Sequence, residues 1–227
     1  MVIVFTDRRQ ARRPLDEVVA AAVDGGARTV VLREKDLPDE ERAALAARLH
    51  EVLAPAGGRL LLAGRTAGWA GLVAGLHGQH LAAADPWPAT PRGLVGRSCH
   101  DAGELAAAAA EGAAYATISP VFASTSKPGY GPPLGLSRLR DLCAGAGLPV
   151  YALGGIESAE RAAECRRAGA AGVAVMGAVM RARDPAAVVA ELVAAVDGDL
   201  PLFVRRAPLS PSVRVAGRPP QEQGRIA

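Results

Sequence analysis

The sequence predicts a single (β/α)8 TIM barrel, an α/β fold in which eight parallel strands alternate with helices. Apolar stretches of strand length occur eight times, and Ala-rich amphipathic stretches of helical length lie between most of them. Near-continuous apolar strands are typical of a parallel sheet that is covered on both faces. An open doubly wound sheet has the same local pattern, but eight repeats in about two hundred residues favour the barrel.

The expected strands are short apolar runs. The first two, with the sequences VIVFT and TVVLR, are dominated by β-branched residues, which favour an extended backbone. Taken in order, the strands are expected at residues 2–6, 29–33, 59–63, 78–81, 94–98, 115–120, 149–154 and 172–177.

The expected helices follow from apolar residues at helical spacing. The helix at 102–111 has the clearest start, because Asp101 followed by Glu104 resembles a capping box. Taken in order, helices are expected at residues 15–23, 39–53, 102–111, 158–168 and 184–196.

Length and composition fit one cytoplasmic domain. The chain has 227 residues, of which 50% are hydrophobic, and this is enough to bury a full core. No run of 18 apolar residues occurs, and the N-terminus lacks the pattern of a signal peptide, so neither a membrane span nor secretion is expected. The three cysteines are an odd number without metal-type spacing, which is typical of a reducing compartment.

The net charge of +3 is confined to residues 199–227, which contain five Arg and two acidic residues. Residues 1–198 are neutral, so no nucleic-acid partner is expected. The segment after residue 198 is rich in Pro, Arg and Gly and has no periodicity. We interpret it as a disordered tail that follows a barrel domain of residues 1–198, with a docked strand or lid near residues 202–204 as the alternative.

In a barrel of this kind, the functional groups lie at the carboxyl ends of the strands. After the second expected strand comes a charged cluster that contains Arg33 and Lys35. Only two of the 26 basic residues, Lys35 and Lys127, are lysines, and a lysine is favoured where a compact ammonium must reach one point. Arg33 and Lys35 are therefore candidate ligand-binding residues, although such clusters are often solvated helix-entry loops.

The fifth expected strand leads into the sequence GRSCH at 96–100. Residues two apart share a face of a strand, so Ser98 and His100 should face the same side and Cys99 the other. If that side is the barrel interior, His100 is a candidate general acid and base at the rim. The alternative is that His100 only precedes the helix that follows. The other histidines, at positions 50, 77 and 80, are expected to have structural or surface roles.

Three further loops could bind an anion. The loop after the sixth strand contains three hydroxyls and the second lysine, namely Ser124, Thr125, Ser126 and Lys127. The loops after strands seven and eight contain Gly154, Gly155, Met176 and Gly177, and in this fold those two loops recurrently bind phosphate. A flexible hydrophilic turn is the alternative for the first of these loops.

Several motifs together resemble thiamine-phosphate synthase and its relatives. They are LREKD at 32–36, ASTSK at 123–127, LGL at 134–136, ALGGI at 152–156 and AGAAGVAVMGAV at 168–179. The resemblance covers residues 5–192 and implies a (β/α)8 barrel, usually a dimer. The family's synthases join a pyrimidine diphosphate to a thiazole phosphate with Mg²⁺ and release pyrophosphate.

Three positions depart from the synthase pattern. The pyrimidine-binding Gln and Asn of the synthases are replaced here by Val31 and Ala63, and one of the two magnesium carboxylates is replaced by Gly64. Only Asp85 is retained of that pair, so the resemblance implies a weakened Mg²⁺ site. The retained Lys35 and Lys127 match positions that bind diphosphate in the synthases.

The GRSCH segment is similar to that of the TenI-type thiazole tautomerases, which are paralogues of the synthases. They convert a non-aromatic carboxythiazole phosphate tautomer into its aromatic isomer and need an acid/base residue but no metal cofactor. The resemblance gives the acid/base role to His100 and phosphate binding to the loops after strands seven and eight. Arg33, Lys35 and Lys127 would bind the carboxylate or orient the ring, with Ser98 and the hydroxyls of the sixth loop nearby.

The sequence therefore favours a thiazole tautomerase of thiamine biosynthesis that binds a small phosphorylated thiazole. The partner that the resemblance implies is a second copy of the chain, in a homodimer. The first alternative is a magnesium-dependent thiamine-phosphate synthase with Asp85 as a metal ligand. The second is a catalytically inert barrel that binds a thiamine precursor.

One prediction concerns the tail. Because residues 199–227 lack hydrophobic periodicity, a chain truncated after residue 198 should fold and retain its activity. Thermal unfolding and turnover of the truncated and full chains, measured side by side, test this. A truncated chain that fails to fold, or folds without turnover, contradicts it.

Overall fold

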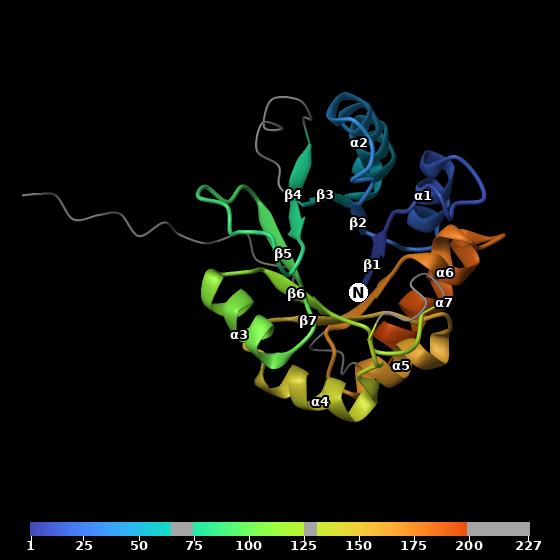
Figure 1. The fold of residues 1–227 in the computed structure, drawn as a ribbon. Coiled ribbons are helices and arrows are strands. Elements are labelled where there is room, and N and C mark those ends of the chain that lie inside the picture. Colours follow the sequence, from blue (N-terminus) through green and yellow to red (C-terminus); the bar gives the residue numbers. More distant parts are fainter. Residues whose placement is uncertain (65–74, 125–130, 199–227) are drawn as a thin grey trace, which may run out of the picture.

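The computed structural model describes residues 1–64, 75–124 and 131–198. Within them, eight parallel strands form a closed barrel in sequence order, with helices on the outside (Figure 1). The predicted barrel is confirmed, and the open sheet is excluded because β1 pairs with β8. The strands are β1 (Val2–Phe5), β2 (Thr29–Leu32), β3 (Arg59–Ala63), β4 (Leu76–Leu81), β5 (Leu94–Cys99), β6 (Tyr115–Ile118), β7 (Val150–Leu153) and β8 (Gly172–Val175).

Helices follow most strands. Each expected strand and helix end lies within two residues of the observed one. The helix at 135–145 was not expected, and residues 82–93 connect β4 to β5 without a helix. The helices are α1 (Leu15–Asp24), α2 (Asp39–Leu53), the short 3-10 helix η1 (Ala54–Ala56), α3 (Ala102–Glu111), α4 (Gly135–Gly145), α5 (Ala159–Arg167), α6 (Gly177–Met180) and α7 (Pro185–Asp197).

Side-chain alternation along the strands divides the apolar residues into two clusters. One cluster fills the barrel and includes Ile3, Leu61, Tyr115 and Tyr151. The other and larger cluster lies between the outer face of the strands and the helices. Because seven of the eight strands contribute to the inner cluster, the barrel interior is a packed core, and space for a ligand is left at its mouth.

No helix in the described ranges is long and apolar enough to cross a membrane. The predicted tail, residues 199–227, lies outside the described residues.

Candidate functional site

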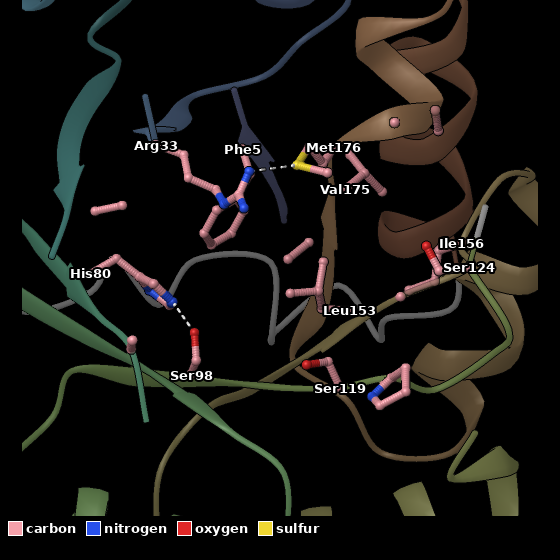
Figure 2. A pocket seen from close by; sticks show the side chains of 18 of the residues that line it. Phe5, Arg33, His80, Ser98, Ser119, Ser124, Leu153, Ile156, Val175 and Met176 are labelled. Atoms are coloured by element: carbon pink, nitrogen blue, oxygen red, sulfur yellow. Dashed lines mark hydrogen bonds between the residues drawn. The ribbon is translucent and has the colours of Figure 1, made fainter. Parts of the chain in front are cut away.

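A cavity of about 330 Å³ opens at the carboxyl ends of the strands. Each of the eight strands, or the loop that follows it, contributes to the lining (Figure 2). The predicted site residues on its wall are Arg33, Lys35, Ser98, His100, Ser124, Gly154, Gly155, Met176 and Gly177. The structure therefore brings these residues together around one cavity.

His100 lies at the rim of the cavity, where β5 leads into α3. Its backbone N–H donates to the Glu104 carboxylate at 2.6 Å, while Asp101 caps α3 by accepting from the backbone N–H of Glu104. Its ring Nδ1 lies 2.8 Å from the backbone carbonyl oxygen of Ser119. A carbonyl oxygen only accepts, so Nδ1 carries a proton, and in the neutral ring Nε2 is the nitrogen that can take up another.

The alternation predicted for this strand is confirmed. Ser98 and His100 both line the cavity, and Cys99 is fully buried in the outer cluster against the helices. Burial raises the pKa of the Cys99 thiol to about 12, so this cysteine stays protonated and takes no part in acid/base chemistry.

His80 is a cavity residue that the sequence did not indicate. Its ring is buried at 3% exposure, with Nε2 2.9 Å from Ser98 Oγ and Nδ1 3.0 Å from the Tyr115 hydroxyl. Burial, together with the charges of Lys35 and Arg97, lowers the pKa of His80 to about 3, so the ring is neutral. The expected structural role fits its burial, but the expectation missed that His80 also lines the cavity.

The charged residues that follow β2 have two different environments. Arg33 and Lys35 line the cavity, and Arg33 extends toward Met176 (Figure 2). Glu34 is buried and accepts hydrogen bonds from the backbone and the guanidinium of Arg8. This ion pair connects the loop after β1 to the loop after β2 and fixes the point where the two cationic side chains leave the backbone.

The loops after β7 and β8 form the wall of the cavity opposite His80. Gly154 and Gly155 both have positive φ values, of 100° and 66°. A Cβ on Gly155 would lie 2.3 Å from the carbonyl oxygen of Ala123, so only glycine fits this close approach. Arg161 in α5 donates to the Gly155 carbonyl oxygen at 2.6 Å and holds the loop in place.

Asp85, the metal ligand expected under the synthase alternative, is not among the residues that line the cavity. Its carboxylate accepts the backbone N–H of Ala82 at 2.8 Å and closes a turn. The position that supplies the second carboxylate in the synthase pattern is Gly64 here. No group of three or more His, Cys, Asp or Glu side chains in the described residues could hold a metal ion. Of the two carboxylates of the synthase pattern, the described residues therefore retain one, and it is engaged in a turn.

The remaining predicted residues, Thr125, Ser126 and Lys127, lie outside the described residues. The sequence also missed Ser119 and Glu157, which line the cavity. Both follow strands whose carboxyl ends were expected at the mouth, so their position after the strands was the available signal. His80 lies inside β4, one residue before its end, so this signal does not identify it.

A closed barrel with a polar cavity at its carboxyl-terminal mouth is the arrangement found in (β/α)8-barrel enzymes. The chain belongs to the thiamine monophosphate synthase family, whose model matches residues 2–179. This confirms the resemblance found in the sequence.

Two curated relatives and one solved structure show the extent of the likeness. The thiamine-phosphate synthase of Roseiflexus castenholzii is 39% identical over 195 residues, which are 82% of this chain and 84% of the relative. That of Anaeromyxobacter dehalogenans is 39% identical over 183 residues, or 78% of this chain and 81% of the relative. A thiamine phosphate pyrophosphorylase from Pyrococcus furiosus has a TM-score of 0.76 at 28% identity and covers 87% of this chain and 95% of its own. The names of these relatives match thiamine-phosphate synthase, the first alternative activity, better than they match the thiazole tautomerase.

The buried His80 ring predicts a pH dependence of stability. The pKa is about 3 in the folded chain and about 6.5 for an exposed ring, so below pH 6.5 the unfolded state binds a proton that the folded state does not. The free energy of unfolding should therefore fall toward acid, by up to about 1.4 kcal/mol per pH unit from this group.

Denaturant unfolding of the wild type and of His80→Gln between pH 7 and pH 4 measures this contribution. As the pH falls, the free energy of unfolding should decrease more steeply for the wild type than for His80→Gln, by the equivalent of about one bound proton. This difference in slope is expected even if the two proteins differ in stability at pH 7. Parallel curves would show that His80 titrates normally in the folded protein.

Proposed function

We propose that the protein is a thiazole tautomerase, which isomerises a carboxythiazole phosphate from a non-aromatic tautomer to the aromatic form. The observation that carries this proposal is the orientation of the His100 ring, with Nδ1–H on the Ser119 carbonyl oxygen and Nε2 as the basic nitrogen. The isomerisation removes a proton at one carbon, the electron pair of that C–H bond enters the ring system, and a proton is added at a second carbon. One positioned base can perform both transfers.

The walls of the cavity contain groups suited to binding the phosphate and the carboxylate of such a substrate. The glycine loops after β7 and β8 would bind the phosphate, with Gly154 and Gly155 on one strand end and Met176 and Gly177 on the other. Arg33 and Lys35 would attract the carboxylate. Ser124 lines the same cavity, and we extend this role to Thr125, Ser126 and Lys127 from their place in the sequence.

Thiamine-phosphate synthase is the second candidate, and the names of the relatives favour it. Its phosphate-binding loops would be shared with the tautomerase, so the loops do not discriminate. The reaction must neutralise a departing pyrophosphate, and carboxylate-bound Mg²⁺ is the usual means. Here the one retained carboxylate, Asp85, accepts a backbone N–H in a turn. This arrangement supports the tautomerase over the synthase.

Substitutions at His100 and Asp85 separate the two candidates. Loss of a general acid/base costs about a hundred- to ten-thousand-fold in rate, so His100→Ala should slow tautomer conversion by that factor. His100→Gln keeps an N–H for the Ser119 carbonyl oxygen but transfers no proton, and it should be equally slow. Affinity for the phosphorylated product should change little in either variant.

Asp85→Asn is the matched control, because an amide oxygen can still accept the Ala82 N–H while the charge is lost. Under the tautomerase proposal, this variant should convert the tautomer at the wild-type rate. Wild-type conversion by both His100 variants would refute the proposal. Coupling activity that Asp85→Asn abolishes would establish the synthase instead.

A further inference from the structure

A row of three hydrogen-bonded side chains runs from the barrel core to the cavity. The Tyr115 hydroxyl contacts His80 Nδ1 at 3.0 Å, and His80 Nε2 contacts Ser98 Oγ at 2.9 Å. Tyr115 and His80 are buried at 1% and 3% exposure, and Ser98 is half-buried on the cavity wall. Figure 2 shows the His80 ring directed at Ser98.

The packing around the row leaves little freedom to its rings. Phe5 packs edge-on against the His80 ring, with 4.9 Å between ring centroids. A Cβ on Gly96 would lie 2.5 Å from the Tyr115 hydroxyl oxygen, so the absence of a side chain at position 96 makes room for that hydroxyl. The three residues therefore meet in one arrangement, and what can differ is the position of the protons.

Only one assignment of the protons gives every buried donor in this row of three side chains an acceptor. Among the described residues, the only hydrogen-bond partner of the Tyr115 hydroxyl is His80. Thr117, the next inward-facing residue on β6, has a buried hydroxyl without a hydrogen bond and does not reach Tyr115. A buried O–H without an acceptor is costly, so Tyr115 donates to His80 Nδ1.

The rest of the row follows from the chemistry of imidazole. A neutral ring that accepts at Nδ1 has its proton on Nε2, and Nε2–H then donates to Ser98 Oγ. Because the Ser98 oxygen already accepts this hydrogen bond, its own O–H is left to donate to a group in the cavity. In the opposite arrangement, Ser98 would donate to His80, and Tyr115 would have no acceptor.

We infer that Tyr115 acts as a positioning residue: through His80, it makes Ser98 a fixed hydrogen-bond donor to the carboxylate of the ligand. The proton positions follow from the contacts of these three side chains alone. The identity of the ligand group that accepts from Ser98 rests on the proposed function. Lys35 also lines the cavity, and its charge acts on the His80 ring, so the acceptor beside Ser98 faces a cation as well as a donor. A carboxylate satisfies both.

The proton positions can be measured without a ligand. In ¹⁵N-labelled wild-type protein, NMR should show His80 as the Nε2–H tautomer, with Nδ1 unprotonated and shifted as a hydrogen-bond acceptor. In Tyr115→Phe the donor to Nδ1 is gone, so both tautomers should be populated. Tyr151→Phe is the matched control: its hydroxyl lies in the same core cluster, 4.0 Å from Met1 Sδ, and should leave the His80 signals unchanged.

A wild-type His80 protonated on Nδ1 would overturn the inference. So would a Tyr115→Phe protein that is folded and keeps a single Nε2–H tautomer. Neither result depends on the reaction catalysed, so a failure of the proposed function would not hide them.

Binding measurements test whether the ligand group that accepts from Ser98 is the carboxylate. Calorimetry should compare the aromatic carboxythiazole phosphate with the same thiazole phosphate lacking the carboxylate. Ser98→Ala should weaken binding of the first by about ten- to a hundredfold and change binding of the second by about twofold or less. Equal losses for both ligands would show that Ser98 does not recognise the carboxylate.

Discussion

Pairing of β1 with β8 closes the sheet, and the position of every side chain in the site depends on that closure. The register Ile3↔Ala174 places the first and last strands side by side, so the carboxyl ends of all eight strands meet around one mouth. The alternation of side chains then directs one set of residues into the barrel. In an open sheet, the same strand ends would form a line, and the glycine loops after β7 and β8 could not face the strands of the other half.

The closed mouth places two histidines at different depths, and depth gives them different chemistry. His80 lies one residue before the end of β4, where burial and nearby cations hold its ring neutral. His100 follows the end of β5 at the rim, where a backbone carbonyl oxygen orients its ring. The neutral, buried ring is suited to orienting hydrogen bonds, and we propose that the ring at the rim exchanges protons with a ligand. Under this proposal, the same residue type serves positioning in one place and catalysis in the other.

Much of this arrangement could be predicted from the sequence, because strand count and alternation are local patterns. Alternation placed Ser98 and His100 on one face and Cys99 on the other, and the structure shows that the first face lines the cavity. The role of His80 could not be found in this way, because its partners are distant in sequence, 18 residues away at Ser98 and 35 at Tyr115. The turn at Asp85 could not be predicted for a related reason: a motif position does not show that a carboxylate accepts a backbone N–H.

The central claim is that the cavity moves protons on one thiazole substrate. The most direct test incubates the wild-type protein with a chelator of divalent cations and offers it two sets of substrates. One set is the non-aromatic carboxythiazole phosphate alone, and the other is a pyrimidine diphosphate with a thiazole phosphate. The account predicts aromatic product from the first set at the same rate with and without chelator. Coupling of the second set with added Mg²⁺, together with no acceleration of the first, would contradict it.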